Sequence, residues 1–538
     1  MSMKFALPFL LTPIAALANQ AQDIERITVS TTRSTAPVST VPATISVITS
    51  EDIAEQLAHT QDLSQILGNL LPSFSPSRQK MTSAGETLRG REPLYMIDGV
   101  PQSNPLRNGS RDGNTIDPAM IERIEVISGA NAIQGMGASG GIINIITKSA
   151  GDFNHQMSAG FSTPTDGGSD SQSYKASYLF SQQLDDISFI GGVSARSTGM
   201  YRDGNGDFVG LDGTQGDTQD STSLDLFLKV KYQLDNEQSI QAMLNHYKIE
   251  GNGDFVAING DPTTGLATSA EKGDIEGDAP RNRVTTFTLD YNHTNIAGGN
   301  LAVQLFTQDF AAMYGGGTFG TFQDPEFGEN LYDQSQNKSQ KFGSRVTYNK
   351  DNLLSSQFDI ATGIDLLSDE TYQELAQTGR HWVPKTKFNN IAPFAQLRYD
   401  GLEDWTFNAG VRYEYGKLKV DDFTTLASYN SSFVEGGEPS FNELLENLGV
   451  VYQVTDDLRF YASYSEGFSM ADVGRVLRGI NQAGLSVESF LNLEPVISDN
   501  RELGFEYASD SFNIKASYFE SDSDLGSRLQ ADADGIYS

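Results

Sequence analysis

The most constraining feature of this chain is an alternation of apolar and polar residues that recurs after Ala150. In Leu224–Leu234 every second residue is Leu, Val or Tyr, and most positions between them are Asp, Lys or Gln. Trp405–Glu414, Leu458–Tyr464 and Phe512–Tyr518 repeat the pattern. A period of two places these sets on opposite faces of a β-strand. About fifteen such segments of roughly ten residues occur, the length with which a tilted strand crosses a membrane.

The connections between these segments alternate in length. Short turns lie at 185–186, 235–237, 297–300, 400–404, 455–457 and 509–511. Long, acidic, Gly-rich stretches lie at about 198–223, 250–282, 311–339, 367–389, 417–442 and 467–499. Short turns on one side and long loops on the other are typical of outer-membrane barrels. A soluble β-sandwich is the alternative, but it has no reason to face Leu, Trp and Tyr outward. We therefore predict an all-β transmembrane barrel.

Composition excludes other classes. The 538 residues include 37 Lys and Arg, 70 Asp and Glu, five His and no Cys, giving a formal net charge of −33. Such an excess of carboxylates repels nucleic acid, so no nucleic-acid partner is expected. Without cysteine there is no disulfide framework and no thiolate metal site. After the first two dozen residues no apolar run approaches the roughly 18 residues that a membrane helix needs.

The N-terminus predicts export. Lys4, the apolar run Phe5–Leu17 and the Ala16–Ala18 cleavage site form a signal peptide, for which a short buried helix is the alternative. We divide the chain into a signal peptide (1–18), a leader (19–40), a small α+β domain (41–149) and the barrel (150–538). Within the small domain we expect a capping-box helix at Glu51–Ala58 and a helix at Asp62–Leu67 ended by Gly68. Its predicted strands are Ala43–Thr49, Leu94–Ile97, Ile121–Ile127 and Ile142–Thr147.

Two glycine patterns in the small domain resemble catalytic or nucleotide-binding motifs and are rejected. Gly135–Gly140 matches G-x-G-x-x-G and Gly137–Gly141 matches G-x-S-x-G. Both motifs require a following helix, whereas Ile142–Thr147 is a predicted strand. The five His residues form no spaced pair on a common element. We expect no enzyme activity, no catalytic residue, no cofactor and no metal site.

The small domain also carries longer motifs. Leu88–Arg91, Leu94–Pro101 and Ile121–Lys148 resemble the plug of TonB-dependent outer-membrane receptors, and Phe407–Tyr413, Phe460–Phe468 and Asp499–Tyr507 resemble barrel strands of the same family. The likeness is greatest to ferric-siderophore receptors, with a weaker likeness to the hydroxamate (aerobactin-type) group. It implies a closed barrel of the 22-stranded type around the plug. The plug-motif residues are Arg89, Gly90, Asp98, Gly99, Pro101, Glu122, Arg123, Glu125, Gly129, Gly135, Gly140, Gly141 and Asn144.

The same resemblance implies contacts between plug and barrel. Arg89 and Arg123 would be charges inside a wet lumen and would need carboxylate partners. Glu502 is one candidate by resemblance, and Glu414 and Glu446 are others. This sequence departs from the family at Gln134, where an aromatic residue usually precedes the glycine.

The leader contains a segment that resembles the TonB box, Glu25-Arg26-Ile27-Thr28-Val29-Ser30. A short β-prone segment on a flexible leader suits strand addition to a partner protein. An ordinary plug strand is the alternative interpretation. The expected partners are the TonB-type inner-membrane energy-coupling complex, a ferric siderophore and outer-membrane lipid.

The resulting functional prediction is TonB-dependent uptake of a ferric siderophore across the outer membrane of a Gram-negative bacterium. Another large nutrient (cobalamin, haem or an oligosaccharide) and a passive porin or adhesin barrel are the alternatives. Because ferric siderophores are often anionic, basic residues are candidate contacts, although each can equally be a solvated loop charge. The candidates are Arg78, Lys80, Arg107 and Arg111 on the plug, and Tyr201, Arg380, His381 and Trp382 on barrel loops.

The number of strands raises a further expectation. Fifteen is fewer than 22, and Asp534–Ser538 is not a terminal strand with a final aromatic residue. We therefore expect that C-terminal strands are missing from this reading frame and that the chain expressed alone does not assemble.

Overall fold

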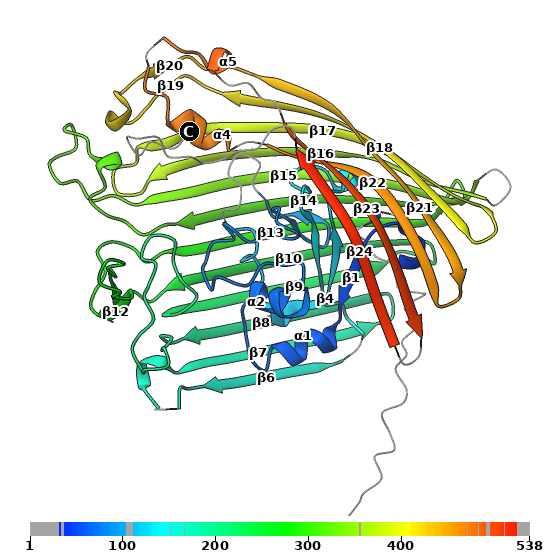
Figure 1. The fold of residues 1–538 in the computed structure, drawn as a ribbon, viewed down its shortest axis with the longest axis horizontal. Coiled ribbons are helices and arrows are strands. Elements are labelled where there is room, and N and C mark those ends of the chain that lie inside the picture. Colours follow the sequence, from blue (N-terminus) through cyan, green and yellow to red (C-terminus); the bar gives the residue numbers. More distant parts are fainter. Residues whose placement is uncertain are drawn as a thin grey trace, which may run out of the picture.

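The computed structural model describes residues 32–33, 37–103, 111–151, 153–165, 167–353, 357–470, 472–482, 484–490, 495–509 and 512–523. Two β-sheets dominate it: one of five strands near the N-terminus and one of fifteen (Figure 1). The large sheet curves, and the blue N-terminal elements lie on its inner side (Figure 1). The predicted number of about fifteen strands is confirmed.

The plug sheet has the order β1–β4–β5–β2–β3. Only the β2–β5 pairing is parallel among these strands. The bounds are β1 Ile45–Ile48, β2 Leu94–Ile97, β3 Val100–Pro101, β4 Ile121–Ser128 and β5 Gly141–Thr147. The four predicted strands are therefore present; β1, β4 and β5 are rich in β-branched residues, and β2 is a fully buried apolar run.

Two helices lie between β1 and β2. α1 (Ser50–Gln56) begins at Thr49, which forms the predicted capping box with Asp52. α2 (Leu63–Leu70) is capped by Asp62, whose side chain accepts from the Ser64 amide. The prediction that Gly68 ends this helix is wrong. Gly68 is internal and packs closely on the Ser75 carbonyl, which an added Cβ would approach to 3.4 Å.

The large sheet runs β24–β23–β22–β21–β18–β17–β16–β15–β14–β13–β10–β9–β8–β7–β6, with β6 and β24 at the ends of this order and every neighbouring pair antiparallel. Its strands are β6 His155–Ser162, β7 Ser173–Leu184, β8 Ile187–Thr198, β9 Ser221–Gln233, β10 Gln238–Gly251, β13 Arg281–Ile296, β14 Gly299–Met313, β15 Ser335–Asn352, β16 Phe358–Leu375, β17 His381–Leu402, β18 Trp405–Val420, β21 Ser440–Thr455, β22 Leu458–Ser469, β23 Val496–Ser509 and β24 Phe512–Ser523.

One predicted long loop is absent. The stretch 367–389 was expected to be a loop, but β16 continues to Leu375 and β17 begins at His381, so a short turn joins them. Pairing persists because Asp369 and Thr371 still point inward while Glu370 and Tyr372 point outward, which keeps the period of two.

The remaining long connections lie at one end of the sheet, which the family resemblance makes the extracellular end (Figure 1). They carry two hairpins and two helices: β11 Phe255–Ile258 with β12 Ser269–Lys272, β19 Phe423–Thr424 with β20 Phe433–Val434, α4 Val473–Arg478 and α5 Val487–Phe490. Within the described residues no helix is long and apolar enough to cross a membrane.

The two faces of the large sheet differ. Outward side chains such as Leu226, Leu305 and Val411 are exposed, as a lipid-facing surface requires. Inward apolar side chains of β7–β10, including Leu179 and Phe227, join the core of the plug. The plug thus packs directly on the barrel wall.

Candidate functional site

A buried ion pair joins the plug to β23. Arg89 lies in a turn with φ +54° and donates from Nη1 to Glu502 Oε2 (2.9 Å) and from Nη2 to Oε1 (3.1 Å). The Tyr461 hydroxyl also donates to this carboxylate (3.0 Å), as does Thr44. These charge-assisted bonds lower the energy of a charge that the plug would otherwise bury alone. The structure thus brings together the two residues that resemblance had paired.

The other predicted plug–barrel contact differs. Arg123 donates to Glu125 Oε1 (2.7 Å), a fully buried carboxylate on the same plug strand, and not to the barrel. Glu414 pairs with Arg412 on its own strand. Glu446 lies on the exposed face of β21. The expectation that Arg123 meets a barrel carboxylate is therefore corrected: a closer partner within the plug neutralises it.

A second ionic cluster holds the leader. Arg33 donates from Nη1 and Nη2 to the two carboxylate oxygens of Asp365 on β16, at 2.7 and 2.6 Å. Arg412 on β18 donates to the same carboxylate (2.7 Å), and Arg345 Nε on β15 lies 3.6 Å from it. The Arg33 side chain is 5% exposed. One aspartate therefore holds the leader against two barrel strands.

Gln134 occupies this cluster as well. Its Oε1 accepts from Arg33 Nε (3.3 Å) and from Arg345 Nη2. The next residue, Gly135, has φ +87°, and a Cβ there would lie 2.8 Å from Arg412 Nη2. Gln134, where the sequence departs from the family pattern, thus places a polar side chain among arginines. The adjacent Gly135 lets the backbone approach these arginines closely.

Several other plug-motif residues form contacts between plug strands and with the barrel wall. Asp98 accepts from the Thr147 amide (2.9 Å) and pairs with Lys229 of β9 (3.0 Å). The Gly99 amide donates to Asn144 Oδ1 (3.1 Å). Gly140 must be glycine because a Cβ would meet the Arg91 carbonyl at 2.4 Å. The remaining motif residues lie in the strands and turns of the plug: Gly90, Pro101, Glu122, Gly129 and Gly141.

A carboxyl group is buried inside the plug. Glu86 is 3% exposed and accepts from Ser64 Oγ (2.5 Å) and Tyr95 OH (3.0 Å). Burial raises the pKa of Glu86 to about 7, and the nearby Asp62 carboxylate adds to the rise. Glu86 therefore connects α2 to β2 in a form that takes up a proton near neutral pH.

This pKa predicts a pH-dependent plug. The folded protein binds a proton at Glu86 more tightly than the unfolded chain does. Its contribution to the free energy of unfolding is therefore full below about pH 4.5 and is lost as the pH rises through about 7. Glu86→Gln should remove on the order of 3 kcal/mol of this dependence in thermal unfolding of the purified receptor. Glu51→Gln, on the exposed first turn of α1, is the control; equal pH dependence in all three proteins would contradict the prediction.

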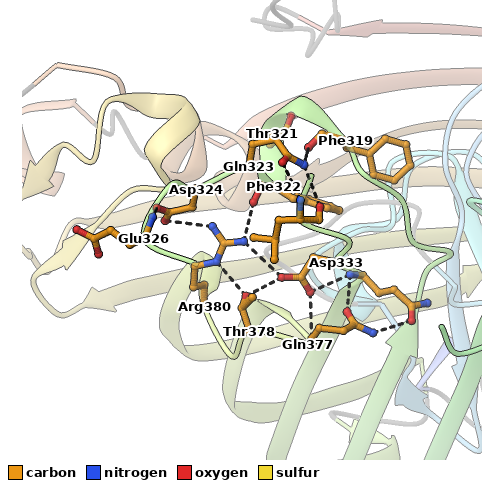
Figure 2. A network of polar contacts seen from close by, with 12 residues as sticks. Phe319, Thr321, Phe322, Gln323, Asp324, Glu326, Asp333, Gln377, Thr378 and Arg380 are labelled. Atoms are coloured by element: carbon orange, nitrogen blue, oxygen red, sulfur yellow. Dashed lines mark hydrogen bonds and ion pairs between the residues drawn. The ribbon is translucent and has the colours of Figure 1, made fainter. Parts of the chain in front are cut away.

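At the extracellular end, a polar network fixes Arg380. Figure 2 shows its guanidinium between Asp324 and Asp333, donating to the Phe322 carbonyl (2.7 Å) and to Asp324 (3.2 Å). Asp333 is fully buried and also accepts from the Gln377 amide (3.0 Å) and Thr378 Oγ1 (2.6 Å). The loop 314–334 is thereby bound to the β16–β17 turn.

Replacing Asp333 should release that loop. Asp333→Ala removes one acceptor from Arg380, which keeps Asp324 and the Phe322 carbonyl. It also leaves the Gln334 and Gln377 amides and the Thr378 hydroxyl without their acceptor, at a cost of about 1–3 kcal/mol. We expect proteases added to whole cells to cut loop 314–334 in this variant much faster than in the parent. Glu329→Ala, an exposed position of the same loop, should cut at the parental rate. Equal cleavage of both variants would show that Asp333 does not hold the loop.

The other candidate ligand contacts occupy different surroundings. Lys80 pairs with Asp217 (2.5 Å), and Arg111 is fully buried and donates to Asn282 Oδ1 (2.6 Å). Arg78 and His381 are exposed, and His381 lines a cavity of about 900 Å³ together with Arg380. Tyr201 is half-buried; Trp382 packs edge-on against Phe322 and beneath Arg478. Arg107 lies outside the described residues.

The proposed TonB box, Glu25–Ser30, and the signal peptide also lie outside the described residues. Among the residues that are described, no group of three or more His, Cys, Asp or Glu side chains could hold a metal ion.

Sequence reasoning did not identify Arg33, Asp365 or Arg345 as site residues. A usable signal existed for Asp365, because it interrupts the inward face of a strand whose outward face carries Ile364 and Leu366. No comparable signal marks Arg33, which belongs to no regular element.

Comparison with known proteins identifies both regions. A family model described as "TonB dependent receptor-like, beta-barrel" matches residues 236–536, and one described as "TonB-dependent Receptor Plug Domain" matches residues 37–142. The ferric aerobactin receptor of Klebsiella pneumoniae is 28% identical, with the alignment covering 96% of this chain and 75% of that protein. The rhizobactin receptor of Rhizobium meliloti is 27% identical, covering 95% and 74%.

Solved structures share the fold. The ferric citrate transporter FecA matches with a TM-score of 0.67 at 17% identity, covering 90% of this chain and 71% of that one. The ferric yersiniabactin uptake receptor of Yersinia pestis matches with a TM-score of 0.64 at 17% identity, covering 89% and 72%.

Proposed function

Since this chain belongs to the TonB-dependent receptor family, we propose that it imports a ferric siderophore across the outer membrane of a Gram-negative bacterium. The proposal extends to this chain what the names of the aerobactin and rhizobactin receptors say of those proteins. In this account the extracellular loops receive the chelate, the plug prevents free diffusion, and the TonB box couples to an inner-membrane energy complex.

The observation that carries the proposal is the attachment of the plug to the barrel wall. Two buried ionic contacts, Arg89–Glu502 and Lys229–Asp98, anchor the plug on strands β23 and β9. A passive porin has no use for a domain fixed inside its lumen, whereas an energised receptor needs one that blocks the path until it is moved. The family consists of receptors and transporters, which supports a transport role.

Iron uptake tests the proposal directly. A strain that lacks the gene is grown under iron limitation with single siderophores, and uptake of radiolabelled iron is compared with and without the restored gene. We expect at least one ferric siderophore to support uptake only in the restored strain, and a TonB deletion to abolish it. Restored uptake of cobalamin or haem instead of any ferric chelate would overturn the proposal.

Processing offers a separate prediction. The mature protein should begin near Asn19 and should fractionate with the outer membrane, because the Ala16–Ala18 site follows a short apolar run. N-terminal sequencing of the membrane fraction is the measurement. An intact Met1 on protein in the soluble fraction would contradict both expectations.

A further inference from the structure

The extracellular end of this molecule is strongly acidic. Four of the long loops, 199–220, 252–280, 314–334 and 421–439, contain nineteen Asp and Glu residues against two basic ones, Arg202 and Lys272, and a fifth, 470–495, adds three acidic residues and two basic ones, Arg475 and Arg478. All four lie at the same end of the large sheet (Figure 1). Charges of one sign around an entrance raise the local concentration of oppositely charged or neutral solutes over that of like-charged ones.

Several basic side chains at this end are engaged with groups of the protein itself. Lys80 pairs with Asp217 at 2.5 Å, and Lys272 pairs with Asp170 at 2.8 Å. Arg380 lies between Asp324 and Asp333, and Arg111 is fully buried against Asn282. Lys80, Lys272 and Arg380 neutralise carboxylates of the protein itself, so an anionic ligand would have to displace a carboxylate to reach them.

Below the loops, two buried acceptors on β15 and β16 have no donor among the described residues. Asn337 of β15 is 1% exposed and Asp369 of β16 is 0% exposed. No described residue donates to Asn337 Oδ1 or to Asp369 Oδ2. Asp369 Oδ1 accepts from Ser339 (2.7 Å) and Thr371 (3.0 Å), so the side chain is held in place while its second oxygen is unpaired. A buried acceptor without a donor is costly and suits a ligand that brings an N–H or O–H group.

A lysine of the barrel wall does not donate to these two acceptors. Lys341, opposite Asp369 in the β15–β16 register, donates to the Gln102 carbonyl (3.1 Å) and to Gln308 Oε1 (3.0 Å). It also lies 3.4 Å from the Pro101 carbonyl. Its three protons are thus directed at the plug and at Gln308, and the acceptors on β15 and β16 stay available.

Building on the function proposed above, we propose that the ferric chelate of this receptor carries no net negative charge and presents hydrogen-bond donors. The acidic loops would favour its entry over that of an anion, and Asn337 and Asp369 would accept its donors. Three hydroxamates, each with one negative charge, neutralise Fe³⁺; three catecholates, each with two, leave the complex anionic. Neutral ferric trihydroxamates and cationic derivatives of them therefore fit, and ferric tricatecholates do not.

Uptake from chelates of known charge tests the inference. The panel is ferrichrome (neutral), ferrioxamine B (cationic), and ferric citrate and ferric enterobactin (anionic), supplied singly to cells with the intact receptor gene. We expect uptake from a neutral or cationic member. Uptake from anionic members alone would overturn this inference and leave the proposed function standing. Uptake from no ferric chelate would overturn the proposed function, and this inference with it.

A matched charge series isolates the electrostatic contribution. Ferrioxamine B and its N-succinyl derivative share one iron cage, but the tail of the first is an ammonium and that of the second a carboxylate. At low salt, we expect that about ten times more of the succinyl form than of ferrioxamine B is needed for the same competition for uptake. This ratio should become smaller at high salt. Equal competition at low salt would overturn the inference.

Loop variants locate the effect. A quadruple variant that neutralises four carboxylates of the acidic loops should reduce the tenfold ratio between the two ferrioxamines to about threefold. Its substitutions are Asp274→Asn, Glu276→Gln, Glu326→Gln and Glu329→Gln. The control neutralises four exposed carboxylates in the turns at the opposite end: Asp185→Asn, Asp186→Asn, Asp456→Asn and Asp457→Asn. It should leave the ratio unchanged. The same reduction in both would show that total charge, and not the loops, sets the preference.

Discussion

Proline at Ile27 or Val29 is expected to reduce iron uptake to the level of a strain without the gene, while the dissociation constant of the chelate changes by less than about twofold. Proline removes a backbone donor and fixes φ, so a segment that must add as a strand to a partner protein no longer pairs. The chelate binds at the extracellular end, which the leader does not reach in this account. Uptake and equilibrium binding, measured on the same cells, separate the two steps.

The control for this experiment is proline at Gln22, which lies in the same leader but before the proposed TonB box. It should leave uptake near the parental rate. Equal loss of binding and uptake in Ile27→Pro would show that the segment is a structural strand of the plug. Equal loss of uptake in Gln22→Pro would show that any rigid leader fails, whatever its sequence.

Removal of the Asp365 carboxylate is expected to destabilise the leader and the plug strongly. In Asp365→Ala, Arg33 and Arg345 face Arg412 with no carboxylate between them, and a buried charge without its partner costs about 3–5 kcal/mol. We expect a lower midpoint of denaturant unfolding for the receptor in detergent. We also expect faster proteolysis within the leader, because Arg33 loses its bidentate contact.

Asp400→Ala is the matched control, since Asp400 also pairs with an arginine, Arg398, at 2.8 Å but is 38% exposed. Its loss should cost less than about 1 kcal/mol. Similar midpoints for the two variants would mean that the Asp365 cluster contributes no more than a surface pair. A lower midpoint without faster leader proteolysis would place its effect in the barrel wall alone.

The strands and the caps of this protein follow from local sequence. A period of two marks the starts of β9, β18, β22 and β24 within three residues, although β18, β22 and β24 extend five or six residues beyond the predicted segments. Thr49 and Asp52 predict the start of α1 because both partners of a capping box lie within one turn. The long extension of β16 and β17 was missed, since a stretch rich in acidic and other polar residues resembles a loop when its partner strand is unknown.

The pairing of charges is a tertiary property. Arg33 and Asp365 are 332 residues apart, and Arg89 and Glu502 are 413 apart. Sequence alone indicates that a buried arginine needs a carboxylate, and resemblance supplied Glu502, but it could not show that Arg123 has Glu125 beside it. Nor could it show that Arg111 and Arg380, predicted as ligand contacts, are used within the protein. Local periodicity indicated most of the strands and the connections between them, and resemblance indicated the plug. Which inward side chains meet depends on strand register and on the position of the plug, because these bring distant residues within bonding distance.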